Sequence, residues 1–469
     1  LRAARFGRQV RALREPFYLV CGYGETGRLV CEGLDRLNLR FVVIERDPLR
    51  VEEARLDDYR NVPPKTTGDA AQPTTLTDAG LLSPHCRGVM ALAVDDETNQ
   101  AIAVACRLLR PDLPVLARVS DPDFDTHLGV FGGDIVVNPF ARFAEHLSSA
   151  LIAPDHYRLR EILTGLPDQK LPAHHQPPRG HWIMCGYGRF GHAIVEELRS
   201  AGQTVSVVDV AHYGEGDVDV RGRGTEAGTL QAAGIDRAVG IVVGNHSDQR
   251  NLAIGVHARD LRPGIFTVLR QNQAATAQLF DQFAPDLVME PSRLVAREFL
   301  AVITTPLLAR FLDRMPGHTE HECASLTRKL ERLNPRRIPE IWSVAITAEP
   351  APAVVRALAE GLPVTLGHLL THPVRREGRP IRALPLLLAR GASVIERPGP
   401  DAELQIGDEI LFAGHGQARR DQSLTLGNGN VLEYVRTGVV HGTGCHWQPL
   451  AYPRRPRTAP PPCAHPDAA

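Results

Sequence analysis

Two glycine-rich turns are the residues of this 469-residue chain best suited to bind a phosphate group. They occupy residues 22–27 and 186–191, each between an apolar stretch and a helical pattern. Glycines at this spacing allow the amides at the start of the next helix to approach a pyrophosphate. An acidic residue, Glu45 or Asp209, follows 23 residues after the first glycine of each turn. Such a carboxylate can accept hydrogen bonds from ribose hydroxyls and repels a 2′-phosphate, which favours NAD or an adenine nucleotide over NADP.

The two turns belong to a long internal repeat. Apolar stretches at residues 17–21 and 41–44 return at residues 182–185 and 205–208, an offset of 164. Further on, Asn99 with Arg118 corresponds to Asn251 with Arg270 at an offset of 152. Each copy alternates short apolar strands with helical patterns, and this order predicts a parallel, doubly wound α/β sheet in each half of the chain.

The second copy differs from the first beside the predicted nucleotide. It is ten residues shorter after Asp209, where the first copy has a predicted helix over residues 51–59 and the second has a Gly/Asp-rich crossing. It also has Arg223 at the position of Asp69. A carboxylate has thus become a guanidinium, and we expect weaker binding, a different ligand or no ligand there.

Six segments are predicted along the chain. The leader has arginines at residues 2, 5, 8, 11 and 14 and is expected to be solvated, or to contact lipid headgroups or a preceding transmembrane element. The linker is rich in Pro, His and Gln, and the tail is rich in Pro and expected to be disordered. The predicted bounds are 1–15 for the leader, 16–166 for the first sheet domain, 167–180 for the linker, 181–314 for the second sheet domain, 315–438 for a small α+β domain and 439–469 for the tail.

Composition excludes several classes of function. Lys and Arg total 53 against 54 Asp and Glu, so no positive charge favours nucleic acid. The eight cysteines form no CxxC motif, which fits a reducing cytosol. No apolar stretch reaches the ~18 residues of a membrane span. The histidine and cysteine groups 318–323 and 441–446 lack the second half of a structural zinc motif, so no metal is predicted.

The repeated motifs resemble the RCK domain, the regulator of potassium conductance of Trk and Ktr uptake subunits and of ligand-gated potassium channels. The resemblance covers about residues 17–305 twice over. It rests on the two Cys-Gly-Tyr-Gly-x-x-Gly turns, on Gly-Asp-Ala at residues 68–70, on Asp-Asp-Glu-x-Asn at residues 95–99 and on Leu-Ala-Arg at residues 116–118. Residues 391–414 resemble the C-lobe of the family. The implied fold is two tandem Rossmann-like lobes followed by one small C-terminal α+β lobe.

The resemblance also implies a nucleotide site in the first lobe. In the first lobe the glycines would lie at the phosphates, Glu45 at the ribose and Asp69 near the adenine, whereas Arg118 would lie near the pyrophosphate or a neighbouring lobe. NAD(H) is the expected cofactor, with ATP or ADP as the alternative. The expected first site comprises Gly22, Tyr23, Gly24, Glu25, Thr26, Gly27, Glu45, Asp69, Ala70 and Arg118. The weaker second site comprises Gly186, Gly188, Arg189, Phe190, Gly191, Asp209 and Arg223.

The expected function is nucleotide-dependent control of a potassium-conducting membrane pore. The pore would lie upstream in the same chain or on a separate subunit. The chain would act as a homo-oligomer, a dimer or a tetramer ring, in the cytoplasm at the inner face of the cell membrane. No catalytic residues are expected, since no nucleophile elbow, P-loop lysine or HExxH motif is present. The alternatives are an NAD-dependent oxidoreductase and a structural assembly platform.

Overall fold

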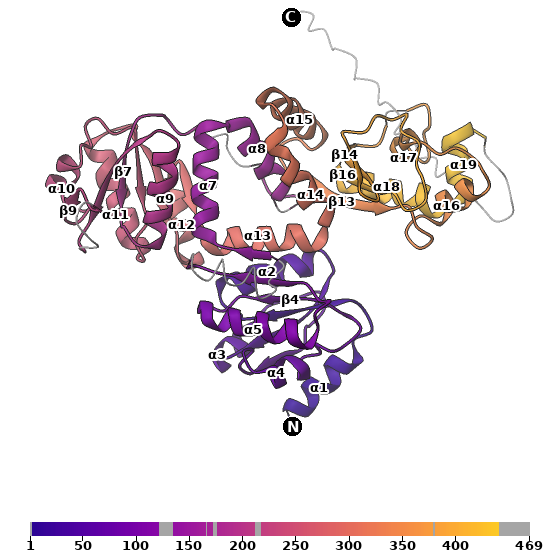
Figure 1. The fold of residues 1–469 in the computed structure, drawn as a ribbon, viewed down its shortest axis with the longest axis horizontal. Coiled ribbons are helices and arrows are strands. Elements are labelled where there is room, and N and C mark those ends of the chain that lie inside the picture. The colour runs from indigo at the N-terminus through magenta and orange to yellow at the C-terminus, as the bar shows by residue number, and fades with distance from the viewer. Residues whose placement is uncertain are drawn as a thin grey trace, which may run out of the picture.

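The computed structural model describes residues 2–121, 135–165, 167–171, 176–211, 217–378 and 380–439. Its two six-stranded sheets and one four-stranded sheet form three bodies joined by long helices (Figure 1). The two larger sheets have the strand orders β3-β2-β1-β4-β5-β6 and β12-β11-β10-β7-β8-β9, with every pairing parallel. The predicted pair of Rossmann-like sheets is confirmed.

The first lobe is built from alternating strands and helices. Its central strands are buried on both faces, as a parallel sheet with helices on each side requires. Its elements are α1 (Arg2–Ala12), β1 (Phe17–Cys21), α2 (Glu25–Arg36), β2 (Arg40–Glu45), α3 (Pro48–Leu56), β3 (Lys65–Thr67), α4 (Pro73–Asp78), β4 (Cys86–Ala91), α5 (Asp96–Leu109), β5 (Val115–Arg118), β6 (Ile135–Val137) and α7 (Pro139–Ile152).

The second lobe repeats this order with shorter connections. No helix corresponding to α3 lies between β8 and β9 in the described residues, and residues 212–216 of that crossing lie outside them. Its elements are β7 (His181–Cys185), α9 (Arg189–Ser200), β8 (Thr204–Asp209), β9 (Val220–Arg221), α10 (Ala227–Ala232), β10 (Gly240–Val243), α11 (Asp248–Leu261), β11 (Phe266–Arg270), η1 (Ala274–Thr276), α12 (Ala277–Phe283), β12 (Leu287–Met289) and α13 (Pro291–Thr304).

The last helix of each lobe packs on the other lobe. Phe140 and Leu147 of α7 lie in the core over α9, although α7 follows the first sheet in the chain. Phe299 and Leu300 of α13 lie in the core over α2, although α13 follows the second sheet. A Cβ atom on Gly33 would lie 2.1 Å from Leu300 Cδ1, so α2 and α13 are in close contact. The two lobes therefore share their cores through these crossover helices.

The third body is an antiparallel sheet in the order β13-β16-β14-β15, and this confirms the predicted α+β lobe. Along β16, Ile410 and Phe412 face a core under α16 to α19, whereas Leu411 and Ala413 face α8, α14 and α15. The elements are α8 (Pro154–Thr164), α14 (Pro306–Arg314), η2 (Met315–Gly317), α15 (Glu320–Leu333), β13 (Glu340–Ala345), α16 (Pro352–Ala359), α17 (Leu366–Leu370), β14 (Ala383–Arg390), β15 (Ser393–Glu396), β16 (Glu409–Gly414), α18 (Gly416–Gly427) and α19 (Gly429–Thr437).

The observed packing crosses several predicted segment bounds. α8 and α14 were expected with the two sheet domains, but their apolar faces, including Leu163 and Phe311, lie in the core of the four-stranded sheet. α1 is a helix whose Phe6 and Val10 are buried in the first lobe. The helix predicted over residues 51–59 ends at Leu56, which is 86% exposed rather than inward-facing. The predicted tail lies outside the described residues from residue 440 onward.

Candidate nucleotide site

The two glycine turns have the same geometry. Gly22 and Gly186 adopt φ angles of 108° and 99°, which side chains on L-residues rarely allow. A Cβ atom on Gly27 would lie 2.0 Å from the carbonyl oxygen of Gly22, and one on Gly191 would lie 2.2 Å from that of Gly186. Both turns therefore require glycine at these positions for the backbone to lead into the next helix.

The acidic residue at the end of the second strand is tied to the turn in both lobes. Glu45 Oε2 accepts a hydrogen bond from the amide of Tyr23 at 2.5 Å, and its Oε1 accepts one from the amide of Asp47 at 2.8 Å. Asp209 Oδ2 accepts from the amide of Tyr187 at 2.6 Å. Because each carboxylate oxygen has two lone pairs, acceptor capacity remains for a ribose hydroxyl.

An asparagine links two strand ends in each lobe. The side-chain amide of Asn99 exchanges hydrogen bonds with the backbone of Ala93 and also donates to the carbonyl oxygen of Arg118 at 2.9 Å. Asn251 makes the same contacts and donates to the carbonyl oxygen of Arg270 at 2.7 Å. These buried amides fix the backbone from which the two arginines project.

Arginines from both lobes gather where the lobes meet. Burial lowers the pKa of Arg118, and burial together with the neighbouring Arg118 and Arg189 lowers the pKa of Arg270 to about 10. The buried Nε atoms of Arg118 and Arg270 have no hydrogen-bond partner within the part of the chain described. Asp96 offsets some of this charge, because one of its oxygens lies 3.8 Å from Arg189 of the other lobe.

The surroundings of the two turns differ in the described part of the chain. The hydroxyl of Tyr23 donates to Asp57 at 2.5 Å and is also hydrogen-bonded to Tyr59, so the turn is joined to the segment after α3. At the second turn, Tyr187 stacks on His192 with ring centroids 3.9 Å apart. The first site therefore has a wall built by α3 and the segment that follows it.

The structure assigns different surroundings to the other predicted site residues. Asp69 accepts a hydrogen bond from the amide of Ala71 within its own turn, whereas the corresponding Arg223 is exposed. Glu25 accepts from the amide of Ala274 in the second lobe, so it also contributes to the contact between lobes. The side chain of Phe190 is buried in the core beneath α7, which leaves only its backbone for a ligand.

Small residues complete the first turn. The hydroxyl of Thr26, near the start of α2, is buried and has no partner in the described part of the chain. Ala70 is buried beside the sheet, and the corresponding Gly224 lies so close to Cys185 that a Cβ atom would be 3.0 Å from its sulfur. Neither Gly24 nor Gly188 would bring a Cβ atom within 3.4 Å of backbone, so both leave room on the ligand side.

Sequence reasoning missed two basic residues near the sites. A Cβ atom on Gly24 would lie 3.4 Å from the guanidinium of Arg50, five residues after Glu45 on α3. The predicted helix that follows Glu45 is the feature of the sequence that could have indicated Arg50. Arg270 was matched to Arg118 through the repeat but was not counted as a site residue, although the offset of 152 was sufficient to include it.

Within the described part of the chain, no three His, Cys, Asp or Glu residues are grouped as metal ligands. His441, Cys445 and His446 lie outside it. No helix in the described part is long and apolar enough to span a bilayer.

Comparison with known proteins identifies the repeated lobe. The TrkA-N domain model matches residues 18–139 and 182–291, one stretch in each lobe. Potassium channel protein 1 of Methanocaldococcus jannaschii is 27% identical over 138 residues, which are 29% of this chain and 40% of that protein. A Trk system potassium uptake protein TrkA homolog of Pyrococcus abyssi is 25% identical over 171 residues, 32% of this chain and 75% of that protein.

Solved structures share the fold along most of the chain. The GsuK RCK domain superposes with a TM-score of 0.52 at 16% identity, covering 88% of this chain and 96% of that chain. The GsuK channel bound to NAD also gives a TM-score of 0.52 at 16% identity, covering 90% of this chain and 82% of that chain. The chain matches less than half of the length of the archaeal channel protein. Two equivalent lobes with two TrkA-N matches show that this chain contains two TrkA-N (RCK) domains, and domains of this family are generally non-enzymatic regulators of potassium transport.

Proposed function

We propose that this chain senses a nucleotide and controls potassium transport through a membrane pore. NAD(H) bound at the first lobe is the proposed signal, with ATP or ADP as the alternative. The observation that carries the proposal is the first site itself, where a phosphate-binding type of turn, the buried carboxylate of Glu45 and the wall after α3 occur together. The NAD-bound state of the GsuK channel, which has the same fold, supports this choice.

The residues of the first lobe fit a dinucleotide. The amides at the start of α2 and the unpartnered hydroxyl of Thr26 would hold phosphate oxygens, and Glu45 would accept hydrogen bonds from a ribose. Arg118 brings a buried guanidinium whose Nε lacks a partner, a donor suited to an anionic ligand. Asp69 would lie near the adenine.

The crossover helices give a route from the ligand to the rest of the molecule. α2 starts at the first turn and packs against α13, which leads directly into α14 and the C-terminal lobe. A nucleotide can shift this packing only by binding one arrangement more tightly than another. The regulated pore would be part of the same polypeptide or a separate subunit at the inner face of the cell membrane, and the chain would work as a dimer or a tetramer ring.

Thermal shift with paired variants tests the ligand and its location. NADH, or ATP or ADP, should raise the melting temperature of the wild-type protein, and Glu45→Ala with Asp69→Ala should remove most of that rise. The matched second-lobe variant, Asp209→Ala with Arg223→Ala, should retain it. An unchanged rise in the first double variant would refute the assigned site.

A second measurement separates regulation from catalysis. In vesicles that contain the chain together with its pore, NADH should change the rate of rubidium uptake, and the Glu45→Ala, Asp69→Ala variant should not respond. NADH absorbance should stay constant when carbonyl substrates are added. Steady consumption of NADH without any change in flux would favour an oxidoreductase instead.

A further inference from the structure

A cavity of about 660 Å³ lies where the crossover helices meet α8 and α14. α7 and α13 are next to α8 and α14 at the centre of the molecule in Figure 1, and residues of all four helices line the cavity. No residue of either glycine turn is among the lining residues. The volume falls within the ~300–1,000 Å³ typical of small-molecule sites.

The inner wall of this cavity has basic groups beside the buried carboxyl groups of Glu161 and Glu298. His146 of α7, Arg160 of α8 and Arg297 of α13 all line it. The Nε2 atom of His146 is shielded from solvent and has no partner among the residues described. Burial, followed by the charges of Arg160, Arg297 and Arg142, lowers the pKa of His146 to about 3. The imidazole is therefore neutral at physiological pH, and the positive charges of the neighbouring arginines disfavour its protonation.

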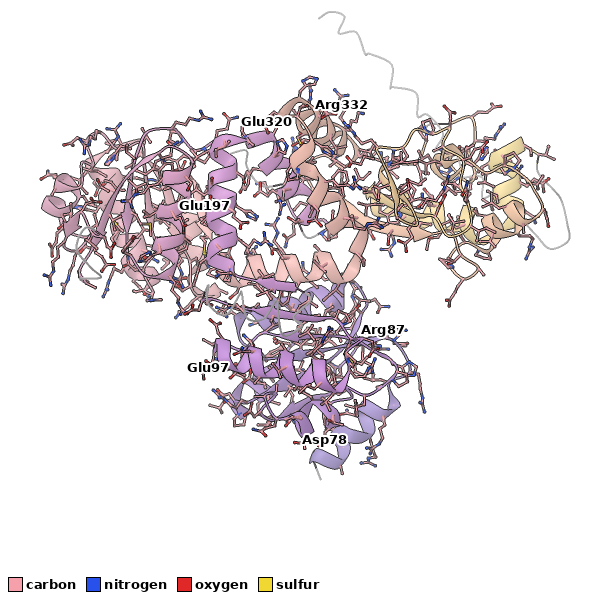
Figure 2. The ribbon with its side chains drawn as sticks, viewed as in Figure 1. Asp78, Arg87, Glu97, Glu197, Glu320 and Arg332 are labelled. Carbon is pink, nitrogen blue, oxygen red and sulfur yellow. The ribbon has the colours of Figure 1, made fainter. Side chains whose placement is uncertain are left out.

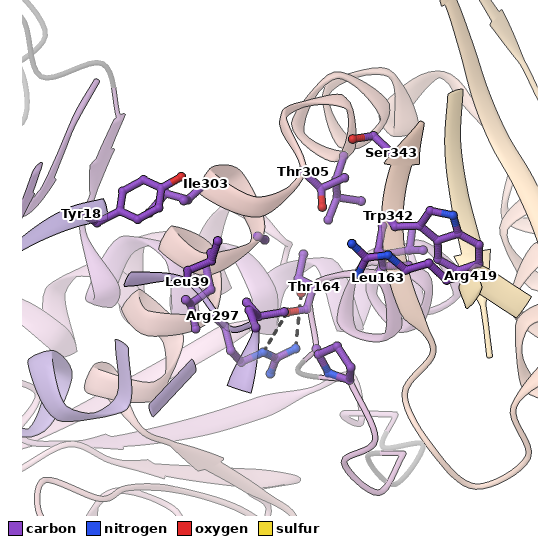
Figure 3. A pocket seen from close by; sticks show the side chains of 17 residues that line it. Tyr18, Leu39, Leu163, Thr164, Arg297, Ile303, Thr305, Trp342, Ser343 and Arg419 are labelled. Carbon is purple, nitrogen blue, oxygen red and sulfur yellow. Dashed lines mark hydrogen bonds between the residues drawn. The ribbon is translucent and has the colours of Figure 1, made fainter. Parts of the chain in front are cut away.

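Most of the surrounding arginines already have partners. Arg297 donates to the carbonyl oxygens of Glu161 and Thr164 at 3.0 and 3.4 Å. Its contacts with Thr164 are drawn in Figure 3, which shows a neighbouring pocket that these two residues also line. Arg142 lies 3.6 Å from Glu298 and 3.0 Å from Glu145.

The guanidinium of Arg160 differs, because it forms no side-chain hydrogen bond or ion pair within 4 Å in the described part of the chain, although its charge partly offsets the effect of burial on the pKa of Glu298. Arg160 is therefore a cation of the inner wall that can contact a ligand.

The remaining lining limits the kind of ligand. Phe143, Leu294 and Leu312 are half-buried apolar side chains of the wall. Four arginines line the cavity against six carboxylates, so a polyanion such as a nucleotide triphosphate would be repelled overall. A ligand with a single anionic group beside Arg160 and an apolar body against the helices fits both the apolar side chains and the small number of cations.

We propose that this cavity binds a small amphipathic organic anion that carries one carboxylate or sulfonate group. The negative group would contact Arg160 and His146, and the apolar body would contact Phe143, Leu294 and Leu312. Such a ligand would join the crossover helices to the two helices that pack on the C-terminal sheet. This site is separate from the nucleotide site, and its test does not depend on nucleotide binding.

Fluorescence titration with two dyes of similar shape tests the proposal. 8-Anilinonaphthalene-1-sulfonate is a monoanion, and N-phenyl-1-naphthylamine lacks the sulfonate. The folded wild-type protein should bind the sulfonate dye at one saturable site at least tenfold more tightly than the neutral dye. Arg160→Gln should abolish this preference, and Ala309→Phe, which fills the cavity from α14, should weaken both dyes at least tenfold.

One control variant, a folding check and a competition with NADH accompany the dye titration. Arg332→Gln on α15 removes an exposed arginine outside the cavity and should leave both affinities unchanged. Circular dichroism should show that all variants are folded, and saturating NADH should not displace the dye. Equal affinity of the two dyes, unchanged binding by both Arg160→Gln and Ala309→Phe, or displacement by NADH would overturn the proposal.

Discussion

Each TrkA-N lobe has a glycine turn of the same geometry, but the residues around the two turns differ. In both, the first glycine has a positive φ, the third packs on a carbonyl oxygen, and an acidic side chain holds the turn from the neighbouring strand. The first turn is tied through a tyrosine hydroxyl to the segment after α3, and the described residues of the second lobe include no helix that corresponds to α3. The turn therefore preserves the backbone of a nucleotide lobe, and we expect the residues around it to decide whether a nucleotide binds.

The two crossover helices also occupy equivalent positions of the repeat but differ in their side chains. At the repeat offset of 152, His146 of α7 corresponds to Glu298 of α13. Burial lowers the pKa of His146 and raises the pKa of Glu298, so burial disfavours the charged form of both side chains. The pseudo-symmetry of the helices thus places a base opposite an acid in one cavity.

The largest expected effect comes from replacing the third glycine of either turn with alanine. Gly27→Ala and Gly191→Ala each force a Cβ atom against a carbonyl oxygen and should lower the free energy of unfolding by about 2–3 kcal/mol. Only Gly27→Ala should also abolish NADH binding. Chemical denaturation and NADH titration of both variants measure the two effects. Loss of binding in Gly191→Ala alone would reverse the assignment of the two lobes.

A smaller effect should appear when the pH falls. The folded-state pKa of His146 is lowered to about 3, so its contribution to stability is full above the unfolded value of 6.5 and is lost as the pH falls below it. Between pH 7 and 5 the wild-type protein should lose about 1–2 kcal/mol more than His146→Gln, as urea unfolding would show.

The comparison with His146→Gln is needed because Glu298 acts in the opposite direction. Its raised pKa means that protonation favours the folded state, so its contribution grows as the pH falls. His321→Gln, at an exposed position of α15, is the matched control and should unfold like the wild type. An identical pH dependence in wild type and His146→Gln would contradict the buried, neutral imidazole.

The sequence alone predicted both sheets, their parallel order, the small C-terminal lobe and the position of Glu45 beside the turn. These features follow from local apolar periodicity and from fixed spacing along the chain. It did not predict the exchange of α7 and α13, because α7 is amphipathic and its apolar face, including Phe140 and Leu147, could cover either sheet. The proximity of Arg50 to Gly24 also depends on how α3 packs rather than on its spacing.

A modest effect is expected at the adenine end of the first site. The carboxylate of Asp69 is half-exposed and accepts a hydrogen bond in its own turn, so Asp69→Asn should weaken NADH binding only about twofold to fivefold. Arg223→Gln in the second lobe should leave the affinity unchanged. Calorimetric titration distinguishes these results, and a loss of one hundredfold in Asp69→Asn would require a more central role for this residue.

The smallest expected effect concerns the contact between lobes. Glu25 is exposed and accepts hydrogen bonds of 3.1 and 3.3 Å from the amide of Ala274, so Glu25→Gln should cost about 0.5 kcal/mol of stability. Glu97→Gln, on the exposed side of α5 (Figure 2), is a suitable control without this contact. A cost above 2 kcal/mol would mean that the contact between the lobes depends on Glu25.

Calorimetric titration of NADH into Glu45→Gln and Asp209→Asn tests the central claim most directly. Both substitutions preserve side-chain shape and remove one charge, and each carboxylate holds its own turn. The account predicts one NADH per wild-type chain, binding at least tenfold weaker in Glu45→Gln and unchanged binding in Asp209→Asn. Unchanged binding in Glu45→Gln together with weakened binding in Asp209→Asn would contradict it.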